Sequence, residues 1–415
     1  MSTKIKLIQT IKSPDNDPIE IVERKGLGHP DTLADGIAES ISIEFSKFTL
    51  KKYGAILNHW VDKVLITGAQ GEIDFGKGVL RSKIQIYIFG KMSKSFAGEN
   101  IDIKPICKKA IINFLSEALP TLNLERDVQI NFTQNDYSKN PYWMNPRNLG
   151  DLPNRTDPRS NDSSVSIAYW PLSKMERLVL EIEKYFYDFK LRPRFRYIGQ
   201  DIKILLVRND WKVDITLCVP FIANDCPSEA FYLRKMSEIK FGLINKTESF
   251  LGSKYKTHID INNADKMPKL KRTKRKGYYM LVSGSSLDDG EVGVVGRGNP
   301  ATGVISSYRI HSVEAPYGKN PVYHAGKVYH YLSQKIARKV SNLYNANTTV
   351  IIASKMGDKI INPANIIIEI NKKFDKQKVK ELVLDVLRGS DWAREIITSR
   401  YFIPKPGGAD NYGGT

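Results

Sequence analysis

The predicted β-strands of this chain alternate polar and apolar residues instead of running continuously apolar. The segment SKIQIYIF at 82–89 is the clearest example, and helical patterns lie between such segments. An alternating strand has one face in a core and the other face free, whereas the strands of a doubly wound parallel sheet are apolar on both faces. The pattern therefore predicts an α+β fold whose sheets pack by one face on helices or on each other.

Helical periodicity is strongest at 173–186. Ser173 and Glu176 have the spacing of a capping box, and the apolar residues that follow share one face. Further helices are predicted after Asp31 and at 103–119, 230–243 and 329–344. Further strands are predicted at 19–22, 61–67, 128–132, 201–207, 212–220, 278–283, 348–353 and 365–370. Residues 133–160 are predicted to form an irregular loop, and the tail PKPGGADNYGGT to be disordered.

The composition is that of a large globular protein. The 415 residues are 41% hydrophobic, which suffices for two or three subdomains. The chain shows no apolar signal-peptide region and no run of about 20 apolar residues, so we expect a cytoplasmic protein that does not span a membrane. The three cysteines, Cys107, Cys218 and Cys226, match neither a disulfide framework nor a CxxC metal site and are predicted to be structural thiols.

The formal net charge of +18 favours an anionic partner such as nucleic acid, lipid headgroups or a polyphosphate. A compositional bias across the genome would give the same surplus of lysine without functional meaning. The basic run KMPKLKRTKRK at 266–276 is a candidate phosphate or nucleic-acid patch. Because it contains no interleaved aromatic residues, a solvated loop is the favoured interpretation.

The first cluster with chemical potential is ERKGLGHPDTLADG at 23–36, between a predicted strand and a predicted helix. A helix N-terminus presents free N–H groups and the positive end of the dipole, which suit a phosphate. Two glycines allow close approach of a ligand, His29 can donate a hydrogen bond, and Asp31 can bind a hard cation such as Mg²⁺. The alternative is an ordinary Gly-Pro turn in which Asp31 caps the helix.

The second cluster is GVVGRGNPATG at 293–303, which follows Asp288, Asp289 and Glu291. Four glycines around Arg297 can form a loop that wraps an anion, with the guanidinium as a multidentate cation. The loop is not a Walker A motif, because no GK[ST] follows, and its GxxGxG spacing is not that of a dinucleotide fingerprint. A plain surface turn is the alternative.

The third cluster, EAPYGKNPVYHAGK at 314–327, has a glycine-flanked lysine shortly before a helix. Alone it is also compatible with a surface turn. Together the clusters give two or three phosphate-type loops and one carboxylate at a helix entry. The sequence contains no nucleophile elbow, HExxH pair or CxxC motif that would indicate another chemistry.

Five blocks, in their order and separations, resemble those of archaeal-type methionine adenosyltransferases (S-adenosylmethionine synthetases). The resemblance spans roughly residues 18–370. The blocks are ERKGLGHPDTLADGIAE, NDSSVSIAYWPLSKMERLVLE from Asn161, GQDIKIL from Gly199, GRGN from Gly296 and GKNPVYHAGKVY from Gly318.

The resemblance implies an enzyme that makes S-adenosylmethionine from ATP and L-methionine. The methionine sulfur attacks C5′ of ATP and expels the triphosphate, which is then hydrolysed to pyrophosphate and phosphate. A thioether has no proton to lose, so the main task is to stabilise a polyanionic leaving group with preorganised cations and N–H donors. The resemblance also implies Mg²⁺ as a cofactor, K⁺ as a further candidate, and a homodimer with active sites at its interface.

Roles for individual residues follow from the resemblance. His29 would assist cleavage at the bond between C5′ and the triphosphate, and Asp31 would bind Mg²⁺. The other residues with an implied catalytic role contact phosphate and are Lys203, Arg297 and Lys319. Those with an implied substrate-binding role are Asp162, Ser163, Glu291, Asn299, Asn320, His324 and Lys327.

The family fold implies three similar α+β subdomains around a pseudo-threefold axis, built from non-contiguous segments. The subdomain with the HPD motif would cover about 1–135, and the one with the NDSS and QDIK blocks about 136–275. The subdomain with the GRGN and GKNP loops would cover about 276–405, followed by a flexible tail at 406–415.

Several positions depart from the family pattern. Glu291 replaces an aspartate, GRGNPATG replaces GRGNRVNG, TQND at 133–136 replaces a glycine-rich segment, and SKMG at 354–357 replaces SQIG. These changes concern adenosine and methionine recognition more than phosphate binding. Two other interpretations stay open, a basic nucleic-acid-binding protein and a non-catalytic family member. The absence of a nucleic-acid-binding motif disfavours the first, and the retained His29 and Arg297 disfavour the second.

Overall fold

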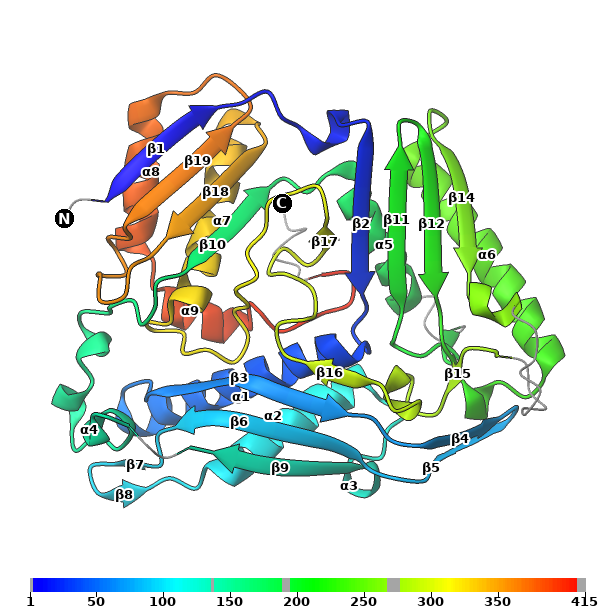
Figure 1. Cartoon of the computed structure of the whole chain (residues 1–415), viewed down its shortest axis with the longest axis horizontal. Helices are drawn as coiled ribbons and strands as arrows, with labels where there is room; N and C mark the ends of the chain where they lie inside the picture. Colours follow the sequence, from blue (N-terminus) through cyan, green and yellow to red (C-terminus); the bar gives the residue numbers. More distant parts are fainter. Residues whose placement is uncertain (1–2, 136–137, 189–194, 267–276, 409–415) are drawn as a thin grey trace.

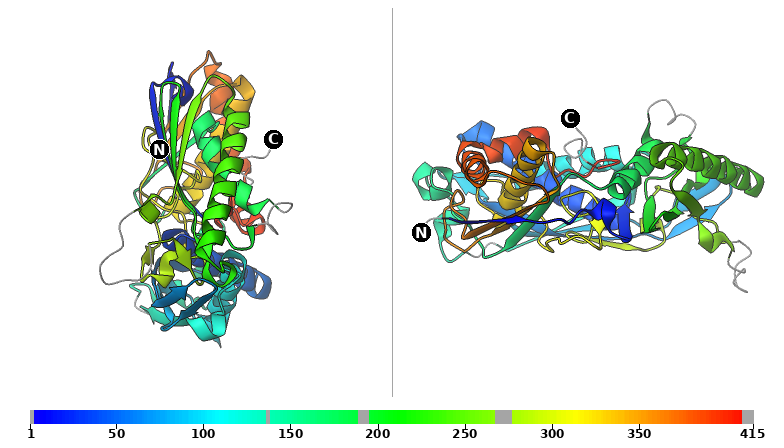
Figure 2. Two further views of the ribbon diagram at one scale, coloured as in Figure 1. Left: turned by 90° about the vertical axis from the view of Figure 1, so that its right-hand side faces the viewer. Right: turned by 90° about the horizontal axis from the view of Figure 1, so that it is seen from above.

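Three mixed β-sheets, each covered by helices on one face, make up most of the chain (Figure 1). The computed structural model describes residues 3–408 apart from 136–137, 189–194 and 267–276. Most of the basic run and the last residue of the TQND segment therefore lie outside the described residues. The helices lie on one side of the molecule and the free faces of the sheets on the other (Figure 2). This arrangement confirms the α+β prediction, while the pseudo-threefold relationship stays a prediction.

The β3 sheet has α1 (Pro30–Tyr53) and α2 (Ile103–Ala118) packed on one face. Its strand order is β16 (Val292–Val294), β3 (His59–Thr67), β6 (Ile84–Met92) and β9 (Val128–Gln134). Inward residues of β3 and β6 are buried and alternate with more accessible ones, as the alternating sequence pattern predicted.

The β11 sheet is covered by α5 (Lys174–Tyr187) and α6 (Glu229–Leu251). Its strand order is β14 (Lys256–Ile261), β12 (Lys212–Cys218), β11 (Lys203–Asn209), β2 (Ile19–Lys25) and β17 (Ile305–Ser306). The predicted capping box at the start of α5 forms both of its hydrogen bonds. Asp210, with φ of 50°, makes the tight connection between β11 and β12.

The β18 sheet carries α7 (Ala325–Tyr344), against which α8 (Lys376–Gly389) and α9 (Trp392–Ser399) pack. Its strand order is β1 (Lys4–Gln9), β19 (Asn365–Ile370), β18 (Thr348–Ala353) and β10 (Val165–Trp170). Each of the three sheets contains one parallel pair, which is β6 with β9, β12 with β14, or β19 with β1. The three units, each a sheet with its covering helices, thus resemble one another in combining antiparallel pairs with one parallel pair.

Shorter elements connect the sheets. They are β4 (Gly71–Asp74), β5 (Lys77–Leu80), β7 (Ser95–Phe96), β8 (Glu99–Asn100), β13 (Phe221–Ile222), β15 (Met280–Leu281), α3 (Leu124–Asp127) and α4 (Pro141–Met144). The strand predicted at 278–283 is only the two-residue β15. It ends where the Asp288 carboxylate accepts the N–H groups of Val282 (2.6 Å) and Ser283 (2.8 Å), which replaces ladder hydrogen bonds by a turn.

All three sheets combine segments that are far apart in the sequence. The β3 and β18 units share one continuous hydrophobic core, and the β11 unit has a core of its own. The last described residues also belong to the fold, since Glu183 accepts the N–H of Gly407 (2.7 Å) and the Lys405 carbonyl accepts from Arg24 (2.8 Å). Gly407 and Gly408, part of the expected flexible tail, are thus buried in the fold.

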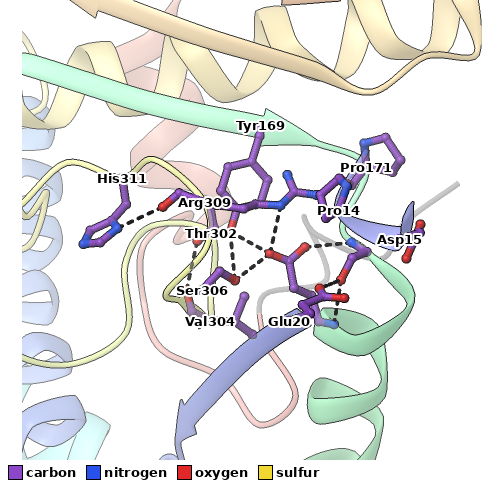
Figure 3. A network of polar contacts seen from close by, with 12 residues as sticks. Pro14, Asp15, Glu20, Tyr169, Pro171, Thr302, Val304, Ser306, Arg309 and His311 are labelled. Atoms are coloured by element: carbon purple, nitrogen blue, oxygen red, sulfur yellow. Dashed lines mark hydrogen bonds and ion pairs between the residues drawn. The ribbon is translucent and has the colours of Figure 1, made fainter. Parts of the chain in front are cut away.

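A buried polar network joins β2 to β10 and the start of α5 (Figure 3). The Glu20 carboxylate accepts hydrogen bonds from Ser173 and from Arg208, the latter at 3.2 Å. Beside it, Glu176 accepts from the Tyr169 hydroxyl at 3.0 Å. Burial raises the pKa of Glu20 to about 7, although the Ser173 and Arg208 hydrogen bonds act in the opposite direction.

Candidate active site

The turn between β2 and α1 is held against the segment that leads into β11. Gly26 donates its N–H to the Ile202 carbonyl (2.7 Å), and Gly28 donates to the Gln200 carbonyl (2.9 Å). A Cβ atom on Gly26 would lie 2.4 Å from the Ile202 oxygen, so this approach requires glycine. The HPD and QDIK blocks are therefore neighbours in space, as a shared phosphate site requires.

Three buried carboxylates on α1 each accept a backbone N–H from a loop of the second or third cluster. Positions 31, 35 and 39 follow one another at intervals of four residues, so their side chains share one face of the helix. The hydrogen bonds are Val294 N to Asp31 Oδ1 (3.0 Å), Gly296 N to Asp35 Oδ1 (2.7 Å) and Gly318 N to Glu39 Oε2 (3.0 Å). One helix thus holds both the GRGN and the GKNP loop.

Lys25, the last residue of β2, joins the HPD turn to the GRGN loop. Its ammonium group lies 2.8 Å from Asp31 Oδ2 and also donates to the Arg297 carbonyl. The predicted substrate-binding residue Asn299 is buried and bonds to the Lys25 backbone. Sequence analysis did not single out Lys25, because only the fold shows that its side chain faces these groups.

Arg297, Lys203 and His29 meet around this junction. The Arg297 guanidinium is exposed and has no ion pair with the residues that the structure describes. The Lys203 side chain is 44% exposed, with its ammonium 3.7 Å from Glu23. The ring of His29 caps α1, where its Nδ1 accepts the N–H of Asp31 (3.2 Å). Burial lowers the pKa of His29 to about 4, so the ring is neutral near pH 7 and carries its proton on Nε2.

The GKNP loop places its predicted binding residues in the interior. Lys327 is fully buried, and its ammonium lies 2.7 and 2.8 Å from the two carboxylate oxygens of Glu39. Lys319 is 6% exposed and bonded to Glu314. The side-chain amide of Asn320 is also buried and donates to the backbone. These residues are therefore not open to solvent in the way that Arg297 and Lys203 are.

A cavity of about 1290 Å³ lies beside the start of α7. Its aromatic lining consists of Trp60, Phe89, Trp143 and Tyr323. Its charged lining consists of Asp62, Lys63, Lys91, Asp157 and Arg159. The predicted residue His324 also lines it, and burial and the nearby lysines lower the pKa of His324 well below its usual value. Sequence analysis missed this cavity because its walls come from distant segments.

The other predicted binding residues lie at the margins of these two regions. Asp162 and Ser163 are exposed beside the cavity rim, where the Ser163 hydroxyl accepts the N–H of Met356 (3.0 Å). Glu291 is exposed just before β16. The cavity and the junction around Lys25 adjoin each other along β3. Lys63 lines the cavity, and the carbonyl of the next residue, Val64, accepts the N–H of Val295 at 3.1 Å.

Comparison with known proteins identifies the family. A sequence model described as S-adenosylmethionine synthetase (AdoMet synthetase) matches residues 3–393. The chain belongs to the S-adenosylmethionine synthetase family. The archaeal-type resemblance is confirmed by the S-adenosylmethionine synthase of Thermoplasma acidophilum, 31% identical over 406 residues, with 95% of this chain and 98% of that protein covered. The probable S-adenosylmethionine synthase of Aquifex aeolicus is 32% identical over 366 residues, with 87% and 88% covered.

Two further relatives of this S-adenosylmethionine synthetase family member bear on its sequence and its fold. An uncharacterized protein of Streptococcus pyogenes serotype M3 is 36% identical over 414 residues, with 97% of this chain and 98% of that protein covered. The structure of an unusual S-adenosylmethionine synthetase from Campylobacter jejuni matches with a TM-score of 0.56 at 15% identity, covering 95% of this chain and 93% of that chain. The second likeness supports the fold alone. No helix in the described part of the chain has the length and apolarity of a membrane span.

S-adenosylmethionine synthetases generally use a divalent metal, and Asp31 is the predicted Mg²⁺ ligand. Both of its carboxylate oxygens have partners, Lys25 and the Val294 N–H, and no group of three potential ligands occurs among the described residues. Mg²⁺ usually binds through one or two carboxylates, water and substrate phosphates. Asp31 fits this use of Mg²⁺, since its carboxylate adjoins the GRGN loop and would hold a Mg²⁺ ion that neutralises part of the triphosphate charge.

Proposed function

We propose that this protein is a methionine adenosyltransferase that forms S-adenosylmethionine from ATP and L-methionine and hydrolyses the triphosphate to pyrophosphate and phosphate. The proposal rests on the convergence of the HPD turn, the start of β11 and the GRGN loop around Lys25. This junction gathers Arg297, Lys203 and His29 at one place, where a triphosphate would meet two exposed cations and a helix N-terminus.

The adjoining cavity supplies the remaining requirements for these substrates. Its aromatic walls suit an adenine ring and a thioether, and its lysines and arginine suit the anionic groups of both substrates. The N–H of Ala325, in the first turn of α7, donates to Asn161 at the cavity wall (2.9 Å). We therefore assign the adenosine and methionine sites to this cavity, with Asp162 and Ser163 at its margin. Glu291 lies away from the cavity, beside Gly68 at the end of β3.

His29 is proposed to act on the leaving group as a neutral donor. Because Nδ1 accepts the Asp31 N–H, Nε2 carries the proton and can donate to the oxygen that departs from C5′. Such a bond strengthens as negative charge develops, so it favours the transition state over bound ATP. Arg297 and Lys203 would stabilise the expelled triphosphate, and Mg²⁺ bound at Asp31 would neutralise part of its charge.

We also propose that the protein forms a homodimer through the free faces of its sheets. Large apolar side chains on these faces are 37–48% exposed in the single chain, namely Ile19, Phe89, Val165, Leu205 and Val292. Exposed apolar groups of this extent indicate a contact surface. Light scattering should give twice the mass of the chain, and Leu205→Lys should shift the mass toward the monomer.

The decisive experiment incubates purified protein with ATP, Mg²⁺ and L-methionine and measures S-adenosylmethionine, pyrophosphate and phosphate. The expected result is formation of all three products, with S-adenosylmethionine absent when methionine is omitted. Arg297→Ala serves as the matched control, because it removes an exposed cation without disturbing the interior. A protein that binds ATP but forms no S-adenosylmethionine would be a non-catalytic member of the family, contrary to this proposal.

A further inference from the structure

The ion pair of Glu39 and Lys327 lies entirely inside the fold, with neither side chain exposed. The Lys327 ammonium contacts both carboxylate oxygens of Glu39, at 2.7 and 2.8 Å. Replacing a buried ion pair by apolar groups of similar size often leaves stability unchanged or raises it, because desolvation offsets the attraction between the charges. Stability alone therefore gives no reason for this pair, and its other contacts are informative.

Glu39 also accepts the N–H of Gly318, at 3.0 Å. Gly318 has φ of 74° and accepts the N–H of Val61 with its carbonyl (2.8 Å), so both of its backbone polar groups are fixed. A Cβ atom at this position would lie 2.6 Å from the Val61 oxygen, which excludes other residues. The next carbonyl, that of Lys319, accepts from the Ser42 hydroxyl on α1 (2.9 Å).

This anchoring determines where the Lys319 side chain stands. Its charge is the largest one that lowers the pKa of His324, which lines the large cavity. The Lys319 ammonium is paired with Glu314, and the same Glu314 oxygen packs against Gly326 in the first turn of α7, two residues after His324 of the cavity lining, so Lys319 lies close to the cavity. A displacement of the Gly318 turn would move this ammonium group relative to a triphosphate, and positional errors of about 1 Å can cost about 10²-fold in rate.

We propose that Glu39 and Lys327 are positioning residues that hold the Gly318 turn and thereby aim Lys319 at the triphosphate. Lys327 then acts through Glu39 and is not itself a phosphate ligand. The inference rests on the proposed function, since it concerns the geometry of that site. It assigns the buried lysine of the GKNP loop a role that its motif alone does not indicate.

Two double variants separate positioning from stability. In Glu39→Gln/Lys327→Met, the amide oxygen can still accept the Gly318 N–H, whereas in Glu39→Leu/Lys327→Met no acceptor remains. Both variants remove the buried charges and keep similar volume, so both are expected to fold, with a somewhat lower melting temperature for the Leu-containing variant because its Gly318 N–H has lost its acceptor. The kinetic and binding measurements are therefore made at a temperature at which both variants are fully folded. For each variant we would measure the melting temperature, kcat and KM for S-adenosylmethionine formation, and the Kd of tripolyphosphate by calorimetry.

The Gln-containing variant is expected to keep kcat within about threefold of wild type, and the Leu-containing variant to lose about tenfold or more in kcat and in tripolyphosphate affinity. Equal kcat and Kd in the two variants would overturn the proposal, whether both match wild type or both fall together. If either double variant fails to fold, the Kd of tripolyphosphate is measured instead for Glu39→Gln, for Lys319→Ala and for the variant that carries both of these substitutions. Wild-type binding by the variant with both substitutions would also overturn the proposal. A wild-type protein without transferase activity would instead refute the proposed function, and the binding comparison would still stand.

Discussion

The side-chain amide of Asn299 bonds to both backbone polar groups of Lys25. Its Oδ1 accepts the Lys25 N–H at 3.0 Å, and its Nδ2 donates to the Lys25 carbonyl at 2.7 Å. The GRGN loop therefore attaches to the end of β2 in the manner of an additional strand. Asn299→Ala should lower the free energy of unfolding by about 1–3 kcal/mol, measured by denaturant titration, because the Lys25 N–H loses its acceptor and the Lys25 carbonyl keeps only the longer bond from the Thr32 hydroxyl (3.3 Å).

Turnover should fall in the same variant, because the loop that carries Arg297 is released. Asn299→Asp is the matched control, since one carboxylate oxygen can still accept the Lys25 N–H while the donor to the carbonyl is lost. Because the other carboxylate oxygen would face the Lys25 carbonyl oxygen at a buried position, Asn299→Asp should be at least as destabilised as Asn299→Ala, and its kcat should also fall. A kcat for Asn299→Ala equal to that of wild type would show that the loop position does not matter for the reaction.

Arg297 and Lys203 are exposed, so their removal should affect the reaction and leave the fold intact. We expect Arg297→Ala and Lys203→Ala each to lower kcat by about 10²-fold or more with a melting temperature close to wild type. Lys319→Ala should lower both quantities, because Lys319 is buried against Glu314. Wild-type rates for Arg297→Ala and Lys203→Ala together would remove the phosphate-site assignment.

His29→Asn should lower the rate of S-adenosylmethionine formation by about 10²-fold or more, with little change in ATP affinity. Hydrolysis of added tripolyphosphate breaks a different bond and should suffer less. Because the pKa of His29 is lowered to about 4, its protonation should leave the wild-type rate level from about pH 5.5 to pH 8. Normal turnover at saturating ATP, combined with much weaker ATP binding, would make His29 a binding residue only.

Asp31→Asn keeps the size of the side chain and its acceptor for the Val294 N–H but loses the charge. If Mg²⁺ binds here, the Mg²⁺ concentration for half-maximal activity should rise about tenfold or more. Asp35→Asn is a suitable comparison, since Asp35 also holds the GRGN loop but is not the proposed ligand. An unchanged Mg²⁺ titration for Asp31→Asn would show that the residue only holds Lys25 and the loop.

Glu20 should make the stability of the protein depend on pH. Its pKa is raised from an ordinary value of 4.5 to about 7, so the folded protein keeps this proton where the unfolded chain has lost it. The contribution of Glu20 to stability is complete below about pH 4.5 and is lost as the pH rises to about 7. Glu20→Gln cannot ionise, so its melting temperature relative to wild type should rise from pH 5 to pH 8. Parallel melting curves over this range would contradict the assignment.

The sequence predicted those helices and strands whose own residue pattern matches the structure that they adopt in the fold. The strands at 348–353 and 365–370 have the predicted bounds, and the capping box of α5 forms as expected. The β1 strand and the α8 and α9 helices were not predicted. The short β1 pairs in parallel with β19, a contact across most of the chain that no local pattern reports.

The same distinction applies to the candidate site. The motifs predicted that the segments of His29, Asp31 and Arg297 belong to one site, and in the fold these segments adjoin, because Asp31 accepts the Val294 N–H and Lys25 bridges Asp31 and the Arg297 carbonyl. The motifs alone did not distinguish Arg297, which faces solvent, from Lys327, which is buried against Glu39. Both are basic residues beside glycines, and only the packing of α1 decides which of them can meet a ligand.

The three carboxylates of α1 also limit how this segment can change in evolution. Each residue of an α-helix turns the next by about 100°, so one insertion or deletion between positions 31 and 39 would rotate Glu39 away from Gly318 while Asp31 kept its loop. Substitutions that keep a carboxylate at each position could accumulate, but a change of length could not. The segment from 31 to 39 thus fixes the spacing between the two loops. Replacing it by the corresponding segment of a related protein should preserve the fold only when the replacement has the same length.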